Sequence, residues 1–108
     1  MTDADFRSVA NIADIPRGKT LRVDVDGQDV LLCHTGEGLY AVANLCTHAA
    51  ERLDGGRLKG CKIHCPLHGA AFDVRDGCAL SRPASEPLAT YAVRIAGDEV
   101  LVAVGVPA

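Results

Sequence analysis

The sequence is poor in the features that mark membrane, secreted and nucleic-acid-binding proteins. It has no Trp and only four aromatic residues among 108, and no apolar run approaches the length of about eighteen residues that a membrane-spanning helix needs. Its acidic start, Met1-Thr2-Asp3-Ala4-Asp5, is followed by no apolar stretch, which argues against a secretory or twin-arginine leader. The net charge of −3 offers no basic patch for nucleic acid. We therefore expect a cytoplasmic protein that binds neither membrane nor nucleic acid.

The length and the cysteine content limit the architecture. A chain of 108 residues has room for one compact domain, so we expect residues 1–108 to form a single domain. Such a domain buries only a modest core, and a bound inorganic group would add to its stability. The five cysteines are an odd number without disulfide-scaffold spacing. In a reducing compartment cysteines are more often metal ligands or buried apolar residues, so the composition permits a metal site.

The hydrophobic pattern is that of short strands separated by turns. Thr20 to Val25 alternates, and Asp26-Gly27 after it is a two-residue hairpin signal. Further strands are expected at about 6–9, 30–33, 39–43, 71–74, 91–95 and 100–104, with a short hairpin within 54–64. There is no convincing long helix and no internal repeat. Many short strands with frequent turns predict an all-β fold, an antiparallel β-sandwich or small barrel.

The chemistry-bearing residues form two matched pairs. Cys46-Thr47-His48 supplies one thiolate and one imidazole, and after sixteen residues Cys65-Pro66-Leu67-His68 supplies the same two groups. Two sulfur and two imidazole ligands suit either a zinc ion or a [2Fe–2S] centre with His in place of two Cys. A structural zinc site in a non-redox module is therefore one interpretation of these four residues.

The pattern C-x-H…C-x-x-H, with Pro after the second Cys and Gly69 after the second His, resembles the Rieske proteins. It is most similar to the small Rieske ferredoxins that serve aromatic-ring-hydroxylating oxygenases. The resemblance implies a Rieske fold with a cluster-binding subdomain at about 45–73, formed by two ligand loops. It also implies one Rieske-type [2Fe–2S] cluster, with Cys46 and Cys65 on one iron and His48 and His68 on the other. Pro83 matches a proline loop that covers the cluster.

Two imidazole ligands change the charge of such a centre. A [2Fe–2S] core held by four thiolates has a formal charge of −2 when oxidised, whereas two neutral imidazoles in place of two thiolates bring it to 0, and reduction then to −1. Adding an electron to a neutral site is easier, so the reduction potential rises above that of an all-cysteine cluster.

This chain departs from the high-potential Rieske proteins around the motif. Those proteins carry an extra Cys in each loop that together form a disulfide, and here Glu51 and Leu67 stand in those places. They also donate Ser and Tyr hydroxyls to sulfur, and here the matching residues are Ala70 and Phe72. Fewer donors stabilise the reduced state less, so we predict a potential at the low end of the Rieske range, roughly −150 mV.

The resemblance implies a one-electron carrier rather than an enzyme, because the chain is too short for the mononuclear iron domain of an oxygenase α-subunit. It would be a monomer that accepts electrons from an NAD(P)H-dependent flavin reductase and passes them to a terminal Rieske non-haem iron oxygenase. That oxygenase would hydroxylate aromatic compounds. The alternative is the Rieske-type small subunit of a nitrite reductase, although such subunits commonly lack one or more of the four ligands.

The remaining cysteines and histidines are interpreted as structural or incidental. Cys33 lies within an apolar strand and is expected to be a small buried hydrophobe. Cys61 and Cys78 lie beside turns, and His34 and His64 are expected to be solvated residues at strand ends.

Overall fold

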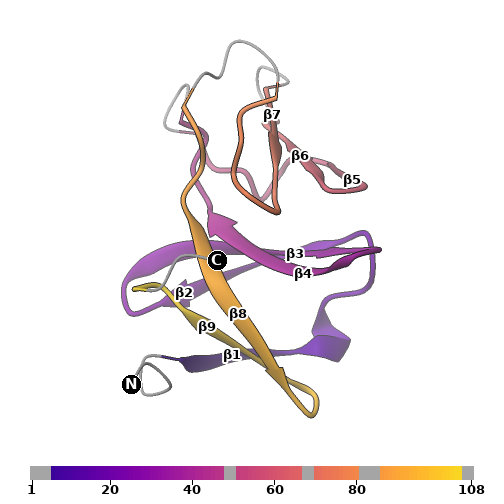
Figure 1. The fold of residues 1–108 in the computed structure, drawn as a ribbon, viewed down its shortest axis with the longest axis vertical. Helices are drawn as coiled ribbons and strands as arrows, with labels where there is room; N and C mark the ends of the chain where they lie inside the picture. Colours follow the sequence, from indigo (N-terminus) through magenta and orange to yellow (C-terminus); the bar gives the residue numbers. More distant parts are fainter. Residues whose placement is uncertain (1–5, 48–50, 67–69, 81–85, 106–108) are drawn as a thin grey trace.

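The computed structural model describes residues 6–47, 51–66, 70–80 and 86–105, and within these ranges it consists of β-strands and one short 3₁₀ helix. The strands form two antiparallel sheets, a six-stranded one and a three-stranded one that lies at its end (Figure 1). The elements are β1 (Arg7–Asn11), η2 (Ile12–Asp14), β2 (Thr20–Val25), β3 (Gln28–Thr35), β4 (Gly38–Ala43), β5 (Leu58–Lys59), β6 (Lys62–His64), β7 (Ala71–Asp73), β8 (Thr90–Ala96) and β9 (Glu99–Ala103). The predicted all-β fold is confirmed.

The large sheet has the strand order β1-β9-β8-β4-β3-β2. Its two edge strands, β1 and β2, also lie next to each other, so the sheet is a nearly closed barrel. Closing a sheet in this way leaves few unpaired backbone groups at an edge. Of the two predicted architectures, the barrel is therefore the one that forms.

The hairpin of β2 and β3 turns at Asp26 and Gly27, as the sequence predicts. Both residues have positive φ angles, 53° and 84°. Positive φ at both central residues is the type I′ geometry, which matches the twist of the flanking strands and favours Asp-Gly. The register that follows pairs Val25 with Gln28 and Thr20 with Cys33.

Strands β3 and β4 are buried on both faces and separate two hydrophobic clusters. One cluster fills the barrel and includes Val30 and Leu32. The other lies between the barrel and the small sheet and includes Leu31 and Cys33, which alternate with them along β3. A strand covered on both sides is apolar at every position, which explains the unbroken run from Val30 to Cys33.

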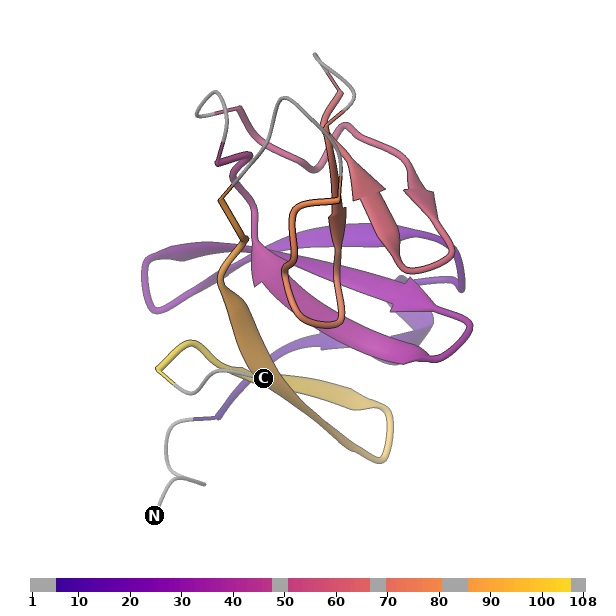
Figure 2. The ribbon, with the colours of Figure 1, turned by 45° about the horizontal axis from the view of Figure 1, so that its top comes forward.

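The small sheet is an insertion between β4 and β8 with the order β5-β6-β7 (Figure 2). The predicted hairpin within 54–64 is confirmed as β5 and β6. Ile63 on β6 pairs with Phe72 on β7, and both side chains are fully buried in the cluster against the barrel. This packing holds the insertion on the outer face of β3 and β4.

The N-terminal segment differs in detail from the prediction. The first strand runs from Arg7 to Asn11, slightly later than expected, and a 3₁₀ turn follows it. The Asn11 side chain accepts a hydrogen bond from the Ala13 N–H, and Asp14 reaches back to the Asn11 N–H. This reciprocal cap stabilises a turn too short to show a helical period in the sequence.

Candidate metal centre

The two cysteines of the matched pairs begin loops of equal size. The N–H of Cys46 donates to the carbonyl of Glu51 (2.6 Å), and the N–H of Cys65 donates to the carbonyl of Ala70 (2.7 Å). Each hydrogen bond joins a cysteine to the residue five positions later, so each loop is closed at its base. Cys46 and Cys65 therefore make equivalent backbone hydrogen bonds at the start of the two sequence motifs.

Cys46 and Cys65 are both buried, at 0% and 2% relative exposure, in the apolar cluster between the barrel and the small sheet. The structure thus brings two sulfur donors from distant parts of the chain into one cluster. His48 and His68 lie outside the described residues, and among the described residues no three His, Cys, Asp or Glu side chains gather as a metal site. Two buried sulfurs that each lead into a loop carrying a His fit the donor set of a two-Cys, two-His centre.

Asn44, just before Cys46, fixes the first loop to the barrel. Its buried side chain donates to the carboxylates of Asp29 (3.1 Å) and Asp54 (3.3 Å), and its oxygen accepts from the N–H of Leu53 (2.9 Å). Both the NH₂ group and the oxygen of the amide therefore have hydrogen-bond partners, as a buried amide requires. No sequence pattern marks Asn44 as part of the site, because its partners come together only in the fold.

The carboxylate of Asp54 also binds Arg52 through two hydrogen bonds, of 3.1 and 3.0 Å. The hydrogen bond from Arg52 lowers the pKa of Asp54 to about 2, assisted by the bond from Asn44 and opposed by burial. Asp54 is therefore a charged acceptor at neutral pH, and it joins the exposed Arg52 to the buried Asn44.

Thr47, between Cys46 and His48, connects the first loop to a remote segment. Its hydroxyl donates to the carbonyl of Glu86 (2.7 Å), which leads into β8. Pro83 and the rest of the predicted proline loop lie outside the described residues. The Thr47 bond therefore holds the chain that follows this loop against the first ligand segment.

Two glycines allow close backbone contacts beside the loops. A Cβ on Gly56 would lie 1.7 Å from the carbonyl oxygen of His64, the residue before Cys65. A Cβ on Gly77 would lie 2.1 Å from the carbonyl oxygen of Leu88, and Gly77 also has a φ of +80°. Only glycine fits at either position, so both are needed for the local packing.

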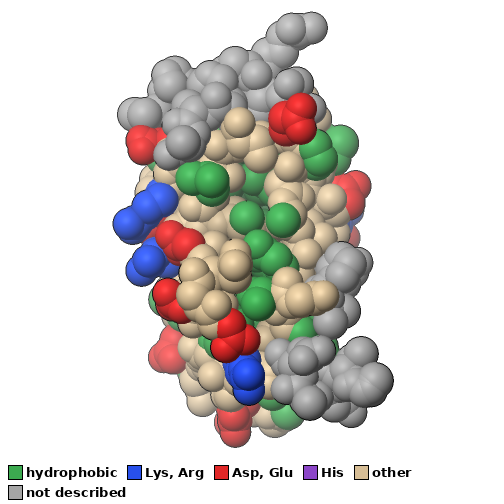
Figure 3. All heavy atoms as spheres, turned by 90° about the vertical axis from the view of Figure 1, so that its left-hand side faces the viewer, with side chains coloured by type: hydrophobic (Ala, Val, Ile, Leu, Met, Phe, Trp, Pro, Cys, Tyr) green, Lys and Arg blue, Asp and Glu red, His purple; other side chains and the backbone are tan. Residues whose placement is uncertain are grey.

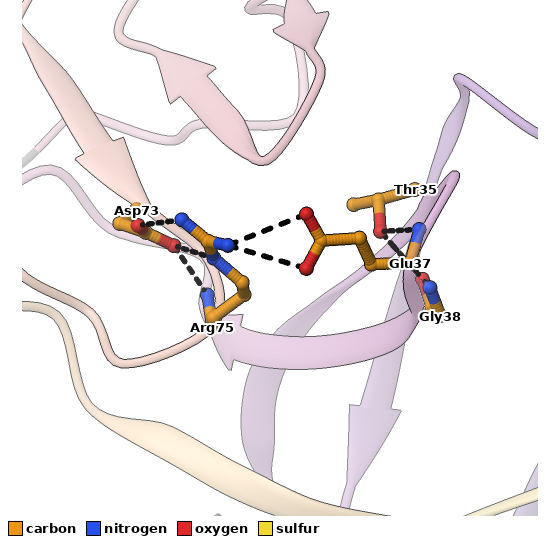
Figure 4. A network of polar contacts seen from close by, with 5 residues as sticks. All are labelled: Thr35, Glu37, Gly38, Asp73 and Arg75. Carbon is orange, nitrogen blue, oxygen red and sulfur yellow. Dashed lines mark hydrogen bonds and ion pairs between the residues drawn. The ribbon is translucent and has the colours of Figure 1, made fainter.

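A charged network links the small sheet to the barrel (Figure 4). The guanidinium of Arg75 binds both carboxylate oxygens of Asp73 (3.0 and 2.8 Å) and reaches Glu37 (3.2 Å) in the turn between β3 and β4. In the same turn the Thr35 hydroxyl accepts from the N–H groups of Glu37 and Gly38. Arg75 lowers the pKa of Asp73, chiefly through their hydrogen bonds.

The cysteines outside the pairs behave as the sequence predicts. Cys33 is fully buried, and burial raises the pKa of its thiol to about 12, so it is a neutral apolar residue. Cys61 is half-buried and Cys78 is exposed, and both lie beside turns.

The two histidines, expected to be solvated residues at strand ends, are partly exposed and each lies beside another segment. His34 is half-buried, and its Nδ1 lies 2.6 Å from the carbonyl oxygen of Ile15, so it joins β3 to the turn before β2. His64 is also half-buried, and it lines a hollow beside Cys65. Neither site could be foreseen from position in a strand, because both depend on segments that the fold brings close.

The residues expected to lower the potential are described in part. Ala70 and Phe72 are fully buried in the same cluster as the two cysteines, and neither has a hydroxyl to donate. Glu51 is half-buried and forms an isolated bridge with Cys46, while Leu67 lies outside the described residues.

In the part of the chain that the structure describes, no helix is long and apolar enough to cross a membrane.

Comparison with known proteins identifies relatives along most of the chain. Residues 5–92 match the family model described as the Rieske [2Fe-2S] domain. The chain is 41% identical over 102 residues to the ferredoxin component of the naphthalene 1,2-dioxygenase system of Pseudomonas aeruginosa, covering 94% of this chain and 97% of that relative.

Solved structures agree with this match. The ferredoxin of carbazole 1,9a-dioxygenase from Nocardioides aromaticivorans IC177 superposes with a TM-score of 0.87 at 38% identity, covering 91% of this chain and 96% of that one. A chain in the complex of reduced oxygenase and oxidized ferredoxin of carbazole 1,9a-dioxygenase gives a TM-score of 0.88 at 33% identity, covering 96% of each chain. A protein described as the small subunit of an NADPH nitrite reductase shares the fold at 18% identity, with a TM-score of 0.80.

Proposed function

Because this chain belongs to the Rieske [2Fe–2S] family, we propose that it is the ferredoxin of an aromatic-ring-hydroxylating oxygenase system. Its cofactor is one Rieske-type [2Fe–2S] cluster, which takes up and releases one electron at a time. The chain is thus an electron-transfer component and not itself the catalyst. This family also removes the zinc module as an interpretation of the four ligands.

We propose Cys46, His48, Cys65 and His68 as the cluster ligands. Support comes from the burial of both cysteines in one apolar cluster and from the matching closure of their loops. Apolar surroundings keep water away from the sulfurs, while Asn44 and Thr47 hold the first loop in place. The chain's own contribution is to position and shield the site.

We further propose that residues 1–108 form one domain, with the ligand-bearing subdomain at about 45–73. The insertion of the small sheet on the outer face of β3 and β4 supports this division.

The electron path has two partners outside this chain. We propose that an NAD(P)H-dependent flavin reductase delivers the electron and that a terminal Rieske non-haem iron oxygenase receives it. The carrier would act as a monomer in the cytoplasm. The similarity to a ferredoxin that forms a complex with its oxygenase supports the second partner.

The observation that carries this proposal is the match along nearly the whole chain to a ferredoxin component, at 41% identity. The alternative, a nitrite reductase small subunit, has less support, because its likeness at 18% identity extends to the fold alone.

Reconstitution tests the proposed function. The purified protein would be mixed with the flavin reductase and the oxygenase encoded in the same genome, with NAD(P)H and an aromatic substrate. Product formation that depends on this chain is the expected result. Co-purification with a sirohaem nitrite reductase, together with no support of oxygenase turnover, would favour the alternative.

A further inference from the structure

A basic hollow lies beside the second ligand loop. One cavity of about 440 Å³ is lined by Arg57, Lys59, His64, Cys65 and Pro66 together with two glycines. A second cavity of about 300 Å³ is lined by Lys19, Arg57 and Lys59 among others. Arg57 and Lys59 line both cavities, and the two neighbouring cavities together are here called the basic hollow. Neither lining contains a carboxylate.

Among the described residues the cations of this hollow form no ion pair, as is also true of Arg17 and Lys62, whereas four arginines elsewhere do. In the described residues four arginines form ion pairs with carboxylates, namely Arg7, Arg22, Arg52 and Arg75. Lys19, Arg57 and Lys59 are exposed and form no ion pair in that part of the chain. Figure 3 shows the side of the molecule away from β5, where acidic side chains are spread over the surface and the basic ones lie next to them.

The strand register adds a second, independent observation. Lys59 on β5 lies directly opposite Lys62 on β6. Like charges at opposed positions destabilise a sheet pair. Asp73, which pairs with Lys62 from the other side, is engaged by Arg75. A chain of net charge −3 therefore places two lysines opposite each other on one short hairpin. Asp73 offsets part of the charge of Lys62, while Lys59 also faces the two cavities that contain no carboxylate.

We propose that the basic hollow is the docking site for an acidic surface of the electron-donating flavin reductase, an inference that rests on the proposed function. Carboxylates of the partner would pair with Lys19, Arg57 and Lys59 and so place it beside Cys65 and Pro66. A few localised cations suit a protein surface with matching carboxylates, whereas a nucleic acid would be repelled by the acidic remainder of the molecule.

Charge also distinguishes the donor from the acceptor. The oxidised carrier is one unit less negative than the reduced carrier. An acidic partner surface therefore binds the oxidised form more tightly and the reduced form more weakly. An electron donor needs a higher affinity for the oxidised carrier than for the reduced one, because it must bind the oxidised carrier and release it after electron transfer. An electron acceptor needs a higher affinity for the reduced carrier. An acidic docking partner is therefore better suited to reduce this chain than to oxidise it.

Charge reversal at the hollow tests the inference. The cluster-loaded full chain would be titrated with the purified reductase by calorimetry, at low and high salt and in the oxidised state. Lys59→Glu should raise the Kd about tenfold at low salt, and high salt should shrink the difference. The matched control is Arg94→Glu on β8, an exposed cation that contacts the Phe6 ring and makes the same change in net charge. It should change the Kd less than twofold.

Three results would overturn the inference. Lys59→Glu and Arg94→Glu could weaken binding to the reductase equally, or Lys59→Glu could leave the Kd for the reductase unchanged. Alternatively, Lys59→Glu could weaken binding to the oxygenase and not to the reductase. An unchanged visible spectrum in both variants shows that the fold and cluster are intact. If the wild-type carrier accepts no electrons from the reductase, the proposed function itself fails. If it does and Lys59→Glu binds equally well, only the docking site is wrong.

Discussion

At the residue scale, the centre depends on a few side chains whose chemistry is unlike that of their neighbours. Cys46 and Cys65 are buried among apolar groups, and each is held by a backbone hydrogen bond across its loop. Cys33 is just as buried, but its thiol stays neutral within β3. Position at the start of a closed loop, more than burial, therefore separates the proposed ligands from a structural cysteine.

Replacing a proposed ligand should abolish the cluster. In Cys46→Ser the harder hydroxyl oxygen replaces a thiolate, so we expect loss of bound iron and of the visible absorbance. Cys78→Ser is the control, because that thiol is exposed beside a turn. Iron analysis and absorption spectra of both proteins provide the measurement. Normal iron content in Cys46→Ser would contradict the assignment.

Ala70 should be one of the residues that keep the potential low. Ala70→Ser places a hydroxyl in a fully buried position at the base of the second loop, and we expect the reduction potential to rise. Ala71→Ser, at the next residue of the chain, is the control, since Ala71 is also buried but does not belong to the cluster that contains the two cysteines. Voltammetry measures the reduction potential of both variants and of wild type. A potential of Ala70→Ser equal to or lower than that of wild type would contradict the idea that the missing hydroxyl keeps the potential low.

Gly56 should tolerate no side chain. Gly56→Ala would put a methyl group 1.7 Å from the backbone oxygen of His64, so we expect it to destabilise the fold by about 3 kcal/mol. The adjacent Gly55→Ala is the matched control, because its nearest neighbour would be the Pro66 side chain at 3.9 Å. Denaturant unfolding compares the two, and similar midpoints would refute the role assigned to Gly56.

At the scale of elements, the ligand loops are built on short strands held by specific links. Asn44, Asp54 and Arg52 tie the end of β4 to the first loop, and the Arg75 network ties β7 to the turn between β3 and β4. The small sheet is too short to be stable alone, so these links and the packing of Phe72 supply its support.

The Asp54 link should make part of the stability depend on pH. Its pKa of about 2 in the folded chain lies below the ordinary value of 3.8, so the charged form stabilises the fold fully above the ordinary value. As the pH falls from about 3.8 towards 2 this stabilisation is lost. We expect Asp54→Asn to be less stable than wild type at pH 6, with the difference shrinking at pH 3. Unfolding followed by circular dichroism measures it.

Asp98→Asn serves as the control for Asp54. The Asp98 side chain makes no hydrogen bond in the described structure, although its backbone carbonyl accepts from Ile12. It should leave the pH profile unchanged. A gap between wild type and Asp54→Asn that is as large at pH 3 as at pH 6 would show that the link is not ionic.

At the scale of the whole molecule, the chain is a barrel with an inserted small sheet at one end, and the proposed ligands lie beside that sheet. The strand pattern and Asp26-Gly27 predicted the all-β fold, because alternation and turn residues are local features of the sequence, whereas the inserted subdomain at one end was implied only by the resemblance to Rieske proteins. The supports of the site could not be predicted in that way. Asn44, Gly56 and the Arg75–Glu37 pair work through partners that only the fold brings close.

The net charge of the chain also did not predict where positive charge gathers on the surface. A net charge of −3 indicated no basic surface, yet Arg57 and Lys59 collect on one short hairpin. Their grouping with Lys19 depends on the fold, which brings the turn before β2 close to β5. Charge patterning in the fold, and not the sum over the chain, sets the surface that a partner meets.

A redox titration followed by electron paramagnetic resonance tests the central claim most directly, namely that this chain is a low-potential Rieske electron carrier. Titration of the purified protein with a reductant should give a rhombic signal from the mixed Cys and His cluster, with a midpoint of roughly −150 mV. A colourless protein with no signal, or a midpoint above zero, would contradict it.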